Sequence, residues 1–442
     1  MGLANRQLDG WQTAGQVLAD RQLPPTLALM TVYRNRHAEQ AIRLALSDTR
    51  IVVVNGARQA GKSTVVHALV DARPRSLERR LDRASELQAA RHDPTEFVRH
   101  DGLLIIDEVQ RAPELILPIK AQVDRDNRPG QYLLTGSARL LGLRNLPDAL
   151  VGRAETIELW PFSQGEIDAR PDRFVDAVFG DTVRLQTDGT LTRADYLQRA
   201  VRGGFPEAID REGGRRSRFF ESYVRDLIDR DVTQLGEIQR RDELSRLLRL
   251  LAARMATPLR IENVANELSI SKSTVERYVA LFEEVFLVKR IGAWSNSATS
   301  RATHTRKLLV VDSGLAAHLT GLTPDRLKRD PAYGGPLLEN FVLGELARQL
   351  TWADTFARLY HYRTRDGQEV DAVLEHNDGR LVGIEVKASS TVTAEDFRHL
   401  VHLRDRTDER FHAGIVLYAG TDILSFGDRL IAAPADALWC TG

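Results

Sequence analysis

Residues 56–63 of the chain read Gly-Ala-Arg-Gln-Ala-Gly-Lys-Ser, and the apolar run Ile51-Val52-Val53-Val54 stands just before them. This is the pattern G-x-x-x-x-G-K-[ST] at the end of an expected strand. Its two glycines, Gly56 and Gly61, let the backbone turn tightly and approach an anion. Apolar residues recur at helical spacing over residues 65–70, so a helix should follow whose first amides point at the same anion. The stretch therefore predicts a phosphate-binding loop between a strand and a helix.

The residue types of this loop also assign roles to its members. Lys62 would reach the β- and γ-phosphates of a nucleotide, and the Ser63 hydroxyl would ligate Mg²⁺. The alternative is a Gly-rich turn formed by chance, but the fixed residues coincide with both a strand and a helix. We therefore expect ATP and Mg²⁺ as ligands. The residues expected to contact ATP are Gly56, Ala57, Arg58, Gln59, Ala60, Gly61, Lys62, Ser63 and Thr64.

A second apolar run ends in two acidic residues. Leu103-Leu104-Ile105-Ile106 is followed by Asp107 and Glu108, and an uninterrupted apolar run is typical of a buried parallel strand. Open α/β sheets bind ligands at the carboxyl ends of their strands. Asp107 would hold the Mg²⁺ ion there, and Glu108 would orient the attacking water. Alone, the pattern is more often a strand that enters a solvated loop, but its place after the phosphate-binding loop favours the functional interpretation.

A third strand is expected over residues 131–134, and it ends in Thr135-Gly136-Ser137. A polar residue at this point can contact the γ-phosphate or the lytic water, and Thr135 is the first candidate, with Ser137 second. Ser137 could instead begin a helix as its N-cap. Farther along, Arg153 could act in cis or in trans as an arginine finger that stabilises charge on the transferring phosphoryl group. Because the chain contains many arginines, the alternative is that Arg153 is an ordinary surface residue.

Composition limits the other functions. The chain has 442 residues and a formal net charge of zero, which suggests about two to four domains and no global basic charge of the kind that dedicated nucleic-acid binders often have. Cys440 is the only cysteine, as expected for a reducing cytoplasm. No apolar stretch approaches the ~20 residues of a membrane helix. Residues 1–29 lack the apolar core of a signal peptide and are expected to form a loosely attached extension.

The middle of the chain is expected to be mainly helical. Residues 218–235 carry an apolar stripe at helical spacing, with a charged opposite face that we interpret as solvated. The alternative is a charged contact with ATP or with a neighbouring subunit. Residues 242–294 then show the spacing of a winged helix, with helices over 244–254, 261–268 and 273–284 and a wing strand over 287–291. If this unit reads DNA, its third helix would present Lys272, Ser273, Thr274, Arg277 and Tyr278 to a major groove. Winged helices also serve as spacers or protein contacts, so this alternative stays open.

The C-terminal part holds a second acidic arrangement. Glu339 stands on an expected helix over 337–350, Asp371 on a strand over 369–374, and Glu385 and Lys387 on a strand over 381–387. In Glu-x-Lys both side chains point to the same face of a strand. One or two divalent ions held by Asp371, Glu385 and Glu339 could activate water, with Lys387 aiding the nucleophile or the phosphate. The order of these residues resembles the core of PD-(D/E)XK nucleases; the alternative is a charged strand edge with an ion pair between Glu385 and Lys387.

Taken in order, these motifs resemble a prokaryotic family of AAA-type ATPases that carry a C-terminal domain of unknown function similar to a PD-(D/E)XK nuclease. The resemblance runs from about residue 32 to the C-terminus. It is carried by four phrases beyond the P-loop: Asp107-Glu108-Val109-Gln110, Leu134-Thr135-Gly136-Ser137, Gly152-Arg153 and Asp312-Ser313-Gly314-Leu315. The family most often has Gly-Lys-Thr-Thr where this chain has Gly-Lys-Ser-Thr, and both hydroxyls suit Mg²⁺. The resemblance implies ATP binding and hydrolysis, but it supplies no substrate.

The sequence thus predicts an α/β protein: a cytoplasmic, Mg²⁺-dependent ATPase that moves its C-terminal modules on DNA. The alternatives are a nucleotide-dependent switch that binds a protein partner, an active metal-dependent nuclease, and an assembly of several copies; no membrane association is expected. The expected order is an N-terminal extension (1–29), a P-loop ATPase core with a parallel sheet (30–162), a helical lid (163–241), a winged helix (242–294), a connector (295–336) and a nuclease-like domain (337–442).

Overall fold

The run at residue 51 forms a strand of a five-stranded sheet, and the apolar stretches before Asp107 and Thr135 form two more. In the computed structural model the strand order is β2-β3-β4-β1-β5, and every neighbouring pair is parallel. The three strands expected from the sequence are confirmed. The strands are β1 (Ile51–Gly56), β2 (Leu77–Arg80), β3 (Leu104–Asp107), β4 (Tyr132–Gly136) and β5 (Ala154–Leu159).

The structure describes residues 33–71, 75–137, 150–232, 240–297, 299, 301 and 304–442. The expected extension over residues 1–29 and the helix expected after Ser137 lie outside these ranges. The residues from Arg36 to Gly442 form one unit.

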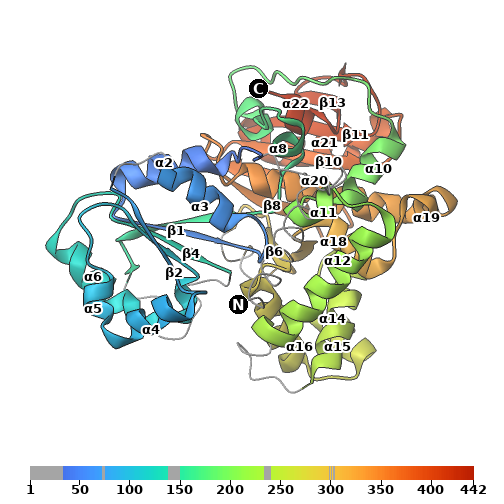
Figure 1. Ribbon diagram of the computed structural model, residues 1–442. Helices are drawn as coiled ribbons and strands as arrows, with labels where there is room; N and C mark the ends of the chain where they lie inside the picture. The colour runs from blue at the N-terminus through green and yellow to red at the C-terminus, as the bar shows by residue number, and fades with distance from the viewer. Residues whose placement is uncertain are drawn as a thin grey trace, which may run out of the picture. The chain divides into compact units, whose positions relative to one another are not determined.

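Both faces of the parallel sheet are covered by helices (Figure 1). Helices α2 (Ala38–Asp48) and α3 (Lys62–Asp71) pack on one face. Helices α4 (Ala84–His92), α5 (Pro94–Phe97) and α6 (Ile116–Arg125) pack on the other. Apolar residues alternate between these two cores along β1, β3 and β4, so these three central strands show no polar face.

Gly56, the first glycine of the loop, is required by strand packing. A Cβ atom on this residue would lie 2.1 Å from the carbonyl oxygen of Leu159, which belongs to the neighbouring strand β5. Glycine is needed at position 61 for a different reason: its φ angle of 97° lies in the region that favours glycine. Of the two glycines, only Gly61 is therefore needed for a positive φ.

A helical segment follows the parallel sheet. It contains α8 (Gln164–Asp168), α9 (Phe174–Val178), α10 (Arg193–Arg202), α11 (Pro206–Ile209) and α12 (Gly213–Asp226). Ser163 begins α8 and Thr192 begins α10 with capping boxes. The helix expected over 218–235 starts earlier than its apolar stripe, and it continues as a π-helix over Leu227–Val232.

Three helices and two antiparallel strands come next. They are α14 (Arg241–Ala253), α15 (Ile261–Leu268), α16 (Lys272–Glu284), β6 (Val288–Ala293) and β7 (Lys307–Val310). The Ser271 hydroxyl caps α16 by accepting a hydrogen bond from the Thr274 amide at 3.1 Å. The expected positions of all three helices are confirmed.

Strands β6 and β7 join the C-terminal strands in one eight-stranded sheet, in the order β12-β13-β11-β10-β9-β8-β6-β7. One sheet therefore spans segments that the sequence assigned to three regions. The stretch 329–336, which has the composition of a linker, contains a 3₁₀ turn and the start of α20 instead. The remaining elements are α18 (Ser313–Thr320), α19 (Pro324–Arg329), α20 (Gly334–Gln349), β8 (Ala357–Arg363), β9 (Glu369–His376), β10 (Leu381–Lys387), α21 (Arg398–Thr407), β11 (Phe411–Tyr418), β12 (Leu424–Ser425), β13 (Leu430–Pro434) and α22 (Ala437–Cys440).

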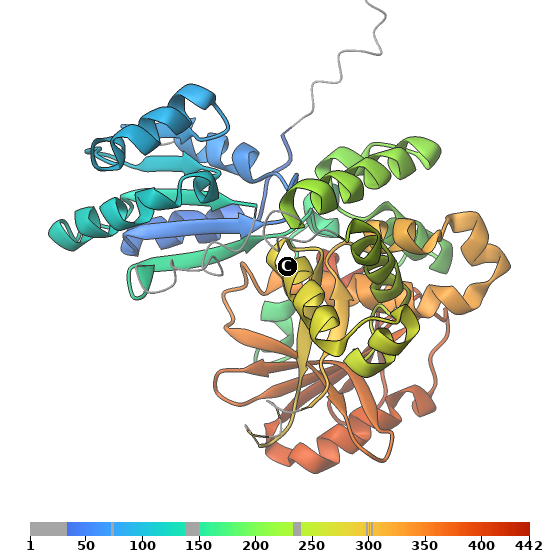
Figure 2. The same cartoon turned by 90° about the horizontal axis from the view of Figure 1, so that it is seen from below.

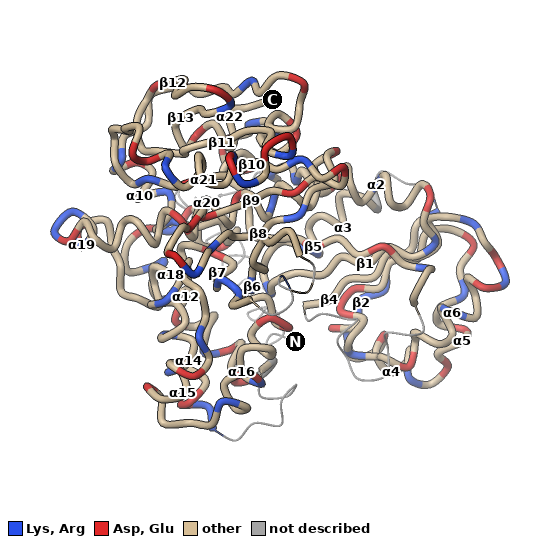
Figure 3. The backbone as a smooth tube through the Cα atoms, turned by 180° about the vertical axis from the view of Figure 1, so that it is seen from behind, with Lys and Arg blue, Asp and Glu red and all other residues tan. Residues whose placement is uncertain are grey.

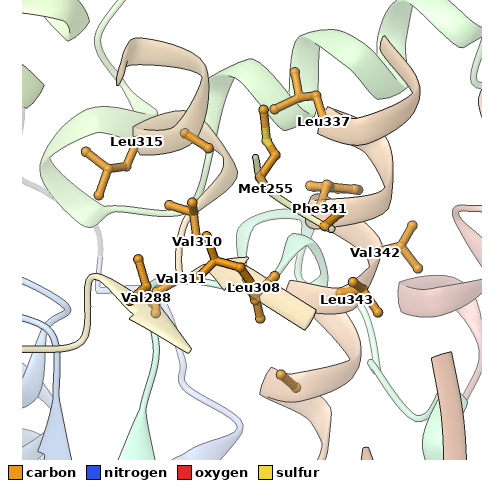
Figure 4. Close-up of a cluster of buried hydrophobic side chains, with 14 of the residues drawn as sticks. Met255, Val288, Leu308, Val310, Val311, Leu315, Leu337, Phe341, Val342 and Leu343 are labelled. Carbon is orange, nitrogen blue, oxygen red and sulfur yellow. The ribbon is translucent and has the colours of Figure 1, made fainter. Parts of the chain in front are cut away.

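Helix α20 is buried along most of its length, and it packs against one face of this sheet. Figure 4 shows Leu308 and Val310 of β7 and Leu337 and Phe341 of α20 in one cluster of buried side chains. Helix α21 covers the opposite face through Leu400 and other apolar residues (Figure 2). The C-terminal sheet is thus a layer between two helical layers.

A buried charged cluster joins the end of the parallel sheet to the C-terminal helices. The Arg348 guanidinium donates hydrogen bonds to the carbonyls of Pro161 at 3.0 Å and Val311 at 3.3 Å, and to the Glu345 carboxylate at 3.1 Å. Its Nη2 also lies 3.8 Å from an oxygen of Asp312. All three charged side chains are almost fully buried, and burial of charge is tolerated only with such partners.

The cluster continues through its two acidic members. Glu345 accepts the backbone N–H of Gln164 at 3.0 Å, and Asp312 accepts the backbone N–H of Gly204 at 2.7 Å. Asp312 also caps α18 by accepting the Leu315 amide at 2.9 Å. Four segments far apart in the sequence are therefore held at one point.

We expect Gly56→Ala to lower the free energy of unfolding by about 2–3 kcal/mol, because the added methyl group overlaps a backbone atom of a packed strand. Gly335→Ala is the matched control, since nothing lies within 4 Å of its Cβ position and its φ is ordinary. The control should change stability by less than about 1 kcal/mol. Urea titrations of both variants measure the difference, and equal stability would contradict the strand-packing role of Gly56.

Candidate functional site

The loop between β1 and α3 closes around the ammonium group of Lys62. Lys62 is 5% exposed, and its Nζ donates hydrogen bonds to the carbonyls of Gly56 at 3.0 Å and Ala57 at 2.9 Å. Gln59 and Gly61 have positive φ angles of 60° and 97°, so the loop curls back over the helix start. This curled backbone in front of a helix is the form that binds phosphate through its amides.

Three side chains meet at the carboxyl ends of β3 and β4, beside the start of α3. The Ser63 hydroxyl donates a hydrogen bond of 3.0 Å to one oxygen of Asp107. The Thr135 hydroxyl donates to the other oxygen of Asp107. Two of these groups, the serine hydroxyl and the carboxylate, are the hard oxygen ligands that Mg²⁺ prefers. The donor set therefore fits the ion that the loop motif implies.

Glu108 lies next to this group on a left-handed backbone, with φ 58° and ψ 44°. Its backbone N–H donates a hydrogen bond to the Thr135 hydroxyl at 3.1 Å, which helps to hold the unusual conformation. Its carboxylate accepts hydrogen bonds from Ser137 at 3.2 Å and from Gln110. The structure thus brings Lys62, Ser63, Asp107, Glu108, Thr135 and Ser137 to one edge of the sheet.

Arg153 lies at the opposite edge of the sheet. It stands before the first residue of β5, where its carbonyl accepts the N–H of Ile51 at the beginning of β1. Its guanidinium donates two hydrogen bonds to Asp124, at 2.6 and 3.0 Å. The interpretation of Arg153 as an arginine finger in cis is therefore wrong: parallel strands place the start of β5 away from the phosphate-binding loop.

Arg36 is the arginine that contacts the loop, and no sequence pattern pointed to it. Its guanidinium donates hydrogen bonds to the carbonyls of Ala60 at 2.8 Å and Trp160 at 2.5 Å, and to the Glu166 carboxylate at 3.0 Å. The guanidinium also stacks over the Phe162 ring at 4.6 Å. The Ser-x-x-Glu capping box that contains Glu166 is a visible signal for that carboxylate, whereas Arg36 has none.

In the C-terminal sheet, a lysine ammonium stands among the carboxylates that were expected to bind metal. Lys307 begins β7 and is fully buried. Its Nζ lies 2.6 Å from Glu339, 3.5 Å from Asp371 and 3.6 Å from Glu369. The cationic partner of this cluster is thus an amino group supplied by the chain itself.

Glu385 and Lys387 lie beside this cluster. Lys387 is 3.6 Å from Glu385 and 3.9 Å from Asp396. The second oxygen of Glu385 is buried and has no hydrogen-bond partner among the described residues. Among those residues, no group of three or more His, Cys, Asp or Glu side chains is arranged to hold a metal ion. The expected second divalent ion at Glu339, Asp371 and Glu385 is therefore not supported.

The electrostatics of the cluster follow from burial. Burial, together with the charge of Asp371, raises the pKa of Glu339 to about 8 and the pKa of Glu385 to about 9. For Lys307 burial alone would lower the pKa, but Glu339 and Asp371 outweigh it and the pKa is raised. The ammonium is therefore fixed as a cation.

Helix α16 does not present the full set of residues expected to face a groove. Tyr278 is 2% exposed, and its hydroxyl donates a hydrogen bond of 3.4 Å to Glu243. Lys272 forms an ion pair of 3.2 Å with Glu262. The expectation that Tyr278 contacts DNA is wrong, because the helical stripe that includes Val275 and Val279 turns this ring into the core.

Comparison with known domain families gives three matches. Residues 48–168 match the AAA domain, residues 193–326 match a domain of unknown function (DUF8612), and residues 334–438 match a second domain of unknown function (DUF4143). The phosphate-binding loop and the strand ending at Asp107 lie inside the first match. The chain thus contains a P-loop, AAA-type ATPase domain, which implies ATP as a ligand.

Two curated relatives are uncharacterized proteins of Mycobacterium bovis and Mycobacterium tuberculosis. Each is 29% identical over 415 residues, covering 92% of this chain and 85% of the relative. Among solved structures, the Walker-type ATPase of Pyrococcus abyssi is similar at 13% identity and a TM-score of 0.40, covering 66% of this chain and 97% of that one. A signal transduction ATPase with numerous domains from Pyrococcus horikoshii is similar at 13% identity and a TM-score of 0.22, covering 73% and 47%.

Within the described part of the chain, we find no helix whose length and apolar character would let it cross a membrane.

We expect Lys307→Met to lower the free energy of unfolding by about 3–5 kcal/mol at neutral pH, because it leaves buried carboxylates without their cation. In the wild type Glu339 releases its proton near pH 8, because Lys307 stabilises the carboxylate. Without Lys307 the folded chain must hold that proton to higher pH, so the deficit should grow as pH rises from about 7 to about 9. Urea titrations across this range measure it, and Mn²⁺ should restore part of the lost stability.

Lys328→Met is the matched control, because Lys328 is exposed on α19. It should change stability by less than about 0.5 kcal/mol at any pH. A Lys307→Met deficit no larger than that of the control would show that the ammonium does not hold the carboxylates.

Proposed function

We propose that the protein is a Mg²⁺-dependent ATPase that hydrolyses ATP at the edge of the parallel sheet and couples hydrolysis to its C-terminal module, which acts on DNA. The observation that carries the proposal is the hydrogen-bonded group of Ser63, Asp107 and Thr135 beside the phosphate-binding loop. It joins the helix start to the ends of β3 and β4. The match of residues 48–168 to the AAA domain supports it independently.

Binding of ATP would use the loop and Lys62. The ammonium now donates to two loop carbonyls, and we infer that it exchanges them for oxygens of the β- and γ-phosphates. The amides of residues 57–64 would surround the phosphates. Mg²⁺ held by Ser63 and Asp107 would neutralise charge on the phosphates.

Hydrolysis needs a group that orients water, and we propose Glu108 for this role. Its carboxylate lies in a polar group with Ser137 and Gln110. Thr135 fixes the backbone of Glu108 and the carboxylate of Asp107 at the same time. We infer that Glu108 accepts a hydrogen bond from the attacking water, and that Thr135 transmits the presence of the γ-phosphate to Glu108.

Coupling would run through the segments that contact the loop. Pro206 lies close to the loop, since a Cβ atom on Gly61 would be 3.8 Å from it. Two residues earlier, the backbone N–H of Gly204 donates a hydrogen bond to the Asp312 carboxylate. A shift of the loop on nucleotide binding would therefore reach α18 and α20. We interpret helices α14–α16 with β6 and β7 as a winged helix, and the strands from β8 onward with α20 as a PD-(D/E)XK-like module.

We propose that this module binds nucleic acid without cutting it. The Lys307 ammonium lies 2.6 Å from Glu339 and 3.5 Å from Asp371, the carboxylates that a nuclease would use for a divalent ion. A divalent ion at these carboxylates would be repelled by the buried ammonium beside them.

The second candidate is a nucleotide-dependent switch that binds a protein partner with little turnover. It is favoured by one observation: the Lys62 ammonium donates two hydrogen bonds to carbonyls of the loop itself, as expected of a stable nucleotide-free state. In this alternative Arg153 could still have a role. It could contact ATP only in trans, at the nucleotide site of a neighbouring copy of the chain.

We expect Lys62→Ala and Glu108→Gln to abolish most ATP turnover, with a loss of at least about a hundred- to a thousandfold for Glu108→Gln, because it removes a group that acts in the transition state. Lys62→Ala should also lose ATP binding, whereas Glu108→Gln should keep it. Steady-state phosphate release and calorimetry with ATP measure the two effects. Lys328→Ala is the control lysine and should match wild type.

The pattern of outcomes separates the two candidates. Wild-type turnover in both variants would overturn the assigned site. ATP uptake without turnover in the wild-type protein would favour the switch. If Arg153 acts in trans, Arg153→Ala should lose turnover, and the specific activity of the wild type should rise with protein concentration.

A further inference from the structure

A hollow of about 970 Å³ lies where three parts of the chain meet: the segment before α15, the connection from β6 to β7, and the C-terminal sheet with α21. We call it the basic pocket. The residues that give it charge are Arg260, His304, Arg363, Arg365, Asp366 and Arg406. Arg365 stands at the turn between β8 and β9, and Arg406 stands in the last turn of α21. The pocket is therefore built from side chains of separate elements.

The pocket is positively charged. Asp366 is the single acidic residue among the described residues that line it, against four arginines. Arg363 is paired with Glu369 at 2.7 Å. No carboxylate of the described residues lies within ion-pair distance of Arg260, Arg365 or Arg406. Residues 295–306, which form the connection, contain no Asp or Glu.

This surplus is a local departure from the rest of the molecule. The chain as a whole has a net charge of zero, and Figure 3 shows basic and acidic residues interspersed along most of the backbone. Elsewhere many arginines have an acidic partner, as Arg290 has Glu283 and Arg301 has Glu375. Three exposed arginines around one hollow are therefore free to bind an anion from outside.

The neutral lining favours phosphate among anions. Ser295, Ser297, Thr305 and Thr364 supply hydroxyl groups, and Asn296 supplies an amide. Hydroxyls, amides and guanidinium groups are the donors that contact phosphate oxygens in nucleic-acid complexes. A hollow of this size with separate cations along it suits a chain of phosphates better than a single one. The ligand chemistry is therefore that of a phosphodiester backbone.

We propose that the basic pocket binds the phosphodiester backbone of DNA, with Arg260, Arg365 and Arg406 as its phosphate contacts. The proposal rests on the proposed function and deepens it, since it names the surface through which the C-terminal module meets DNA. It moves the contact away from α16, where Tyr278 is buried and Lys272 is already paired.

The test compares the wild type with Arg260→Gln/Arg365→Gln/Arg406→Gln by fluorescence anisotropy on a labelled duplex DNA and on its single strand, over a range of salt concentrations. Each lost phosphate contact lowers the slope of log affinity against log salt by roughly one. The triple variant should therefore lose about three in slope and at least about tenfold in affinity at low salt. Its ATP turnover without DNA and its melting temperature should match wild type.

Lys272→Gln/Arg277→Gln on α16 is the matched control and should keep the wild-type slope. A wild type that binds DNA with a slope unchanged in the triple variant would overturn the pocket and leave the proposed function standing. A slope lowered only in the α16 variant would do the same, and would identify α16 as the contact. No DNA binding by the wild type at low salt would overturn DNA action itself.

Discussion

The arrangement of the unit Arg36–Gly442 depends on the hydrogen bonds that the Arg348 guanidinium donates. The guanidinium is buried, and its hydrogen bonds go to the end of the parallel sheet, to the segment before α18 and to its own helix. A buried cation must find such partners, because water cannot reach it. Moving any segment that supplies a partner would leave the buried cation without a hydrogen bond and would destabilise the fold. These segments are therefore held in place. Glu345 and Asp312 extend the same constraint to the amides of Gln164 and Gly204.

This constraint reaches the nucleotide site through short paths. Gly204 lies two residues before Pro206, which is close to Gly61 of the loop, and Arg36 donates a hydrogen bond to the loop carbonyl of Ala60. Side chains from outside the parallel sheet thus contact the phosphate-binding loop. Without these contacts the loop could only bind ATP. With them, a change in the loop conformation on nucleotide binding can move the contacting segments. The same physical contacts that stabilise the loop give hydrolysis a way to do work elsewhere.

Much of the fold and most residues of the nucleotide site could be predicted from the sequence, but not the ion pairs around Lys307 or the role of Arg36. The strands before Asp107 and Thr135 and the helix after Lys62 follow from local patterns, because a continuous apolar run or a helical stripe fixes burial within a few residues. Arg153 and Tyr278 could not be placed this way, since sheet direction and helix rotation decide where they point. Lys307 could have been suspected, because it is one of seven lysines in an arginine-rich chain and stands at the edge of a buried strand. Its partners, however, come from 32 and 64 residues away, which no local pattern encodes. Arg36 has no sequence signal at all.

The shared eight-stranded sheet limits how the protein can be divided. Strand β6 pairs with β8 through Gly292 and Ala293, and Trp294 donates its backbone N–H to the carbonyl of His361 at 2.6 Å. A fragment that began at residue 337 would expose the unpaired edge of β8 and the apolar face where β7 packs on α20. Open edges of this kind recruit other strands and lead to aggregation. The domain of unknown function at the C-terminus is therefore a part of a larger folding unit, and its boundaries in a family model differ from the boundaries at which the chain could be cut and still fold.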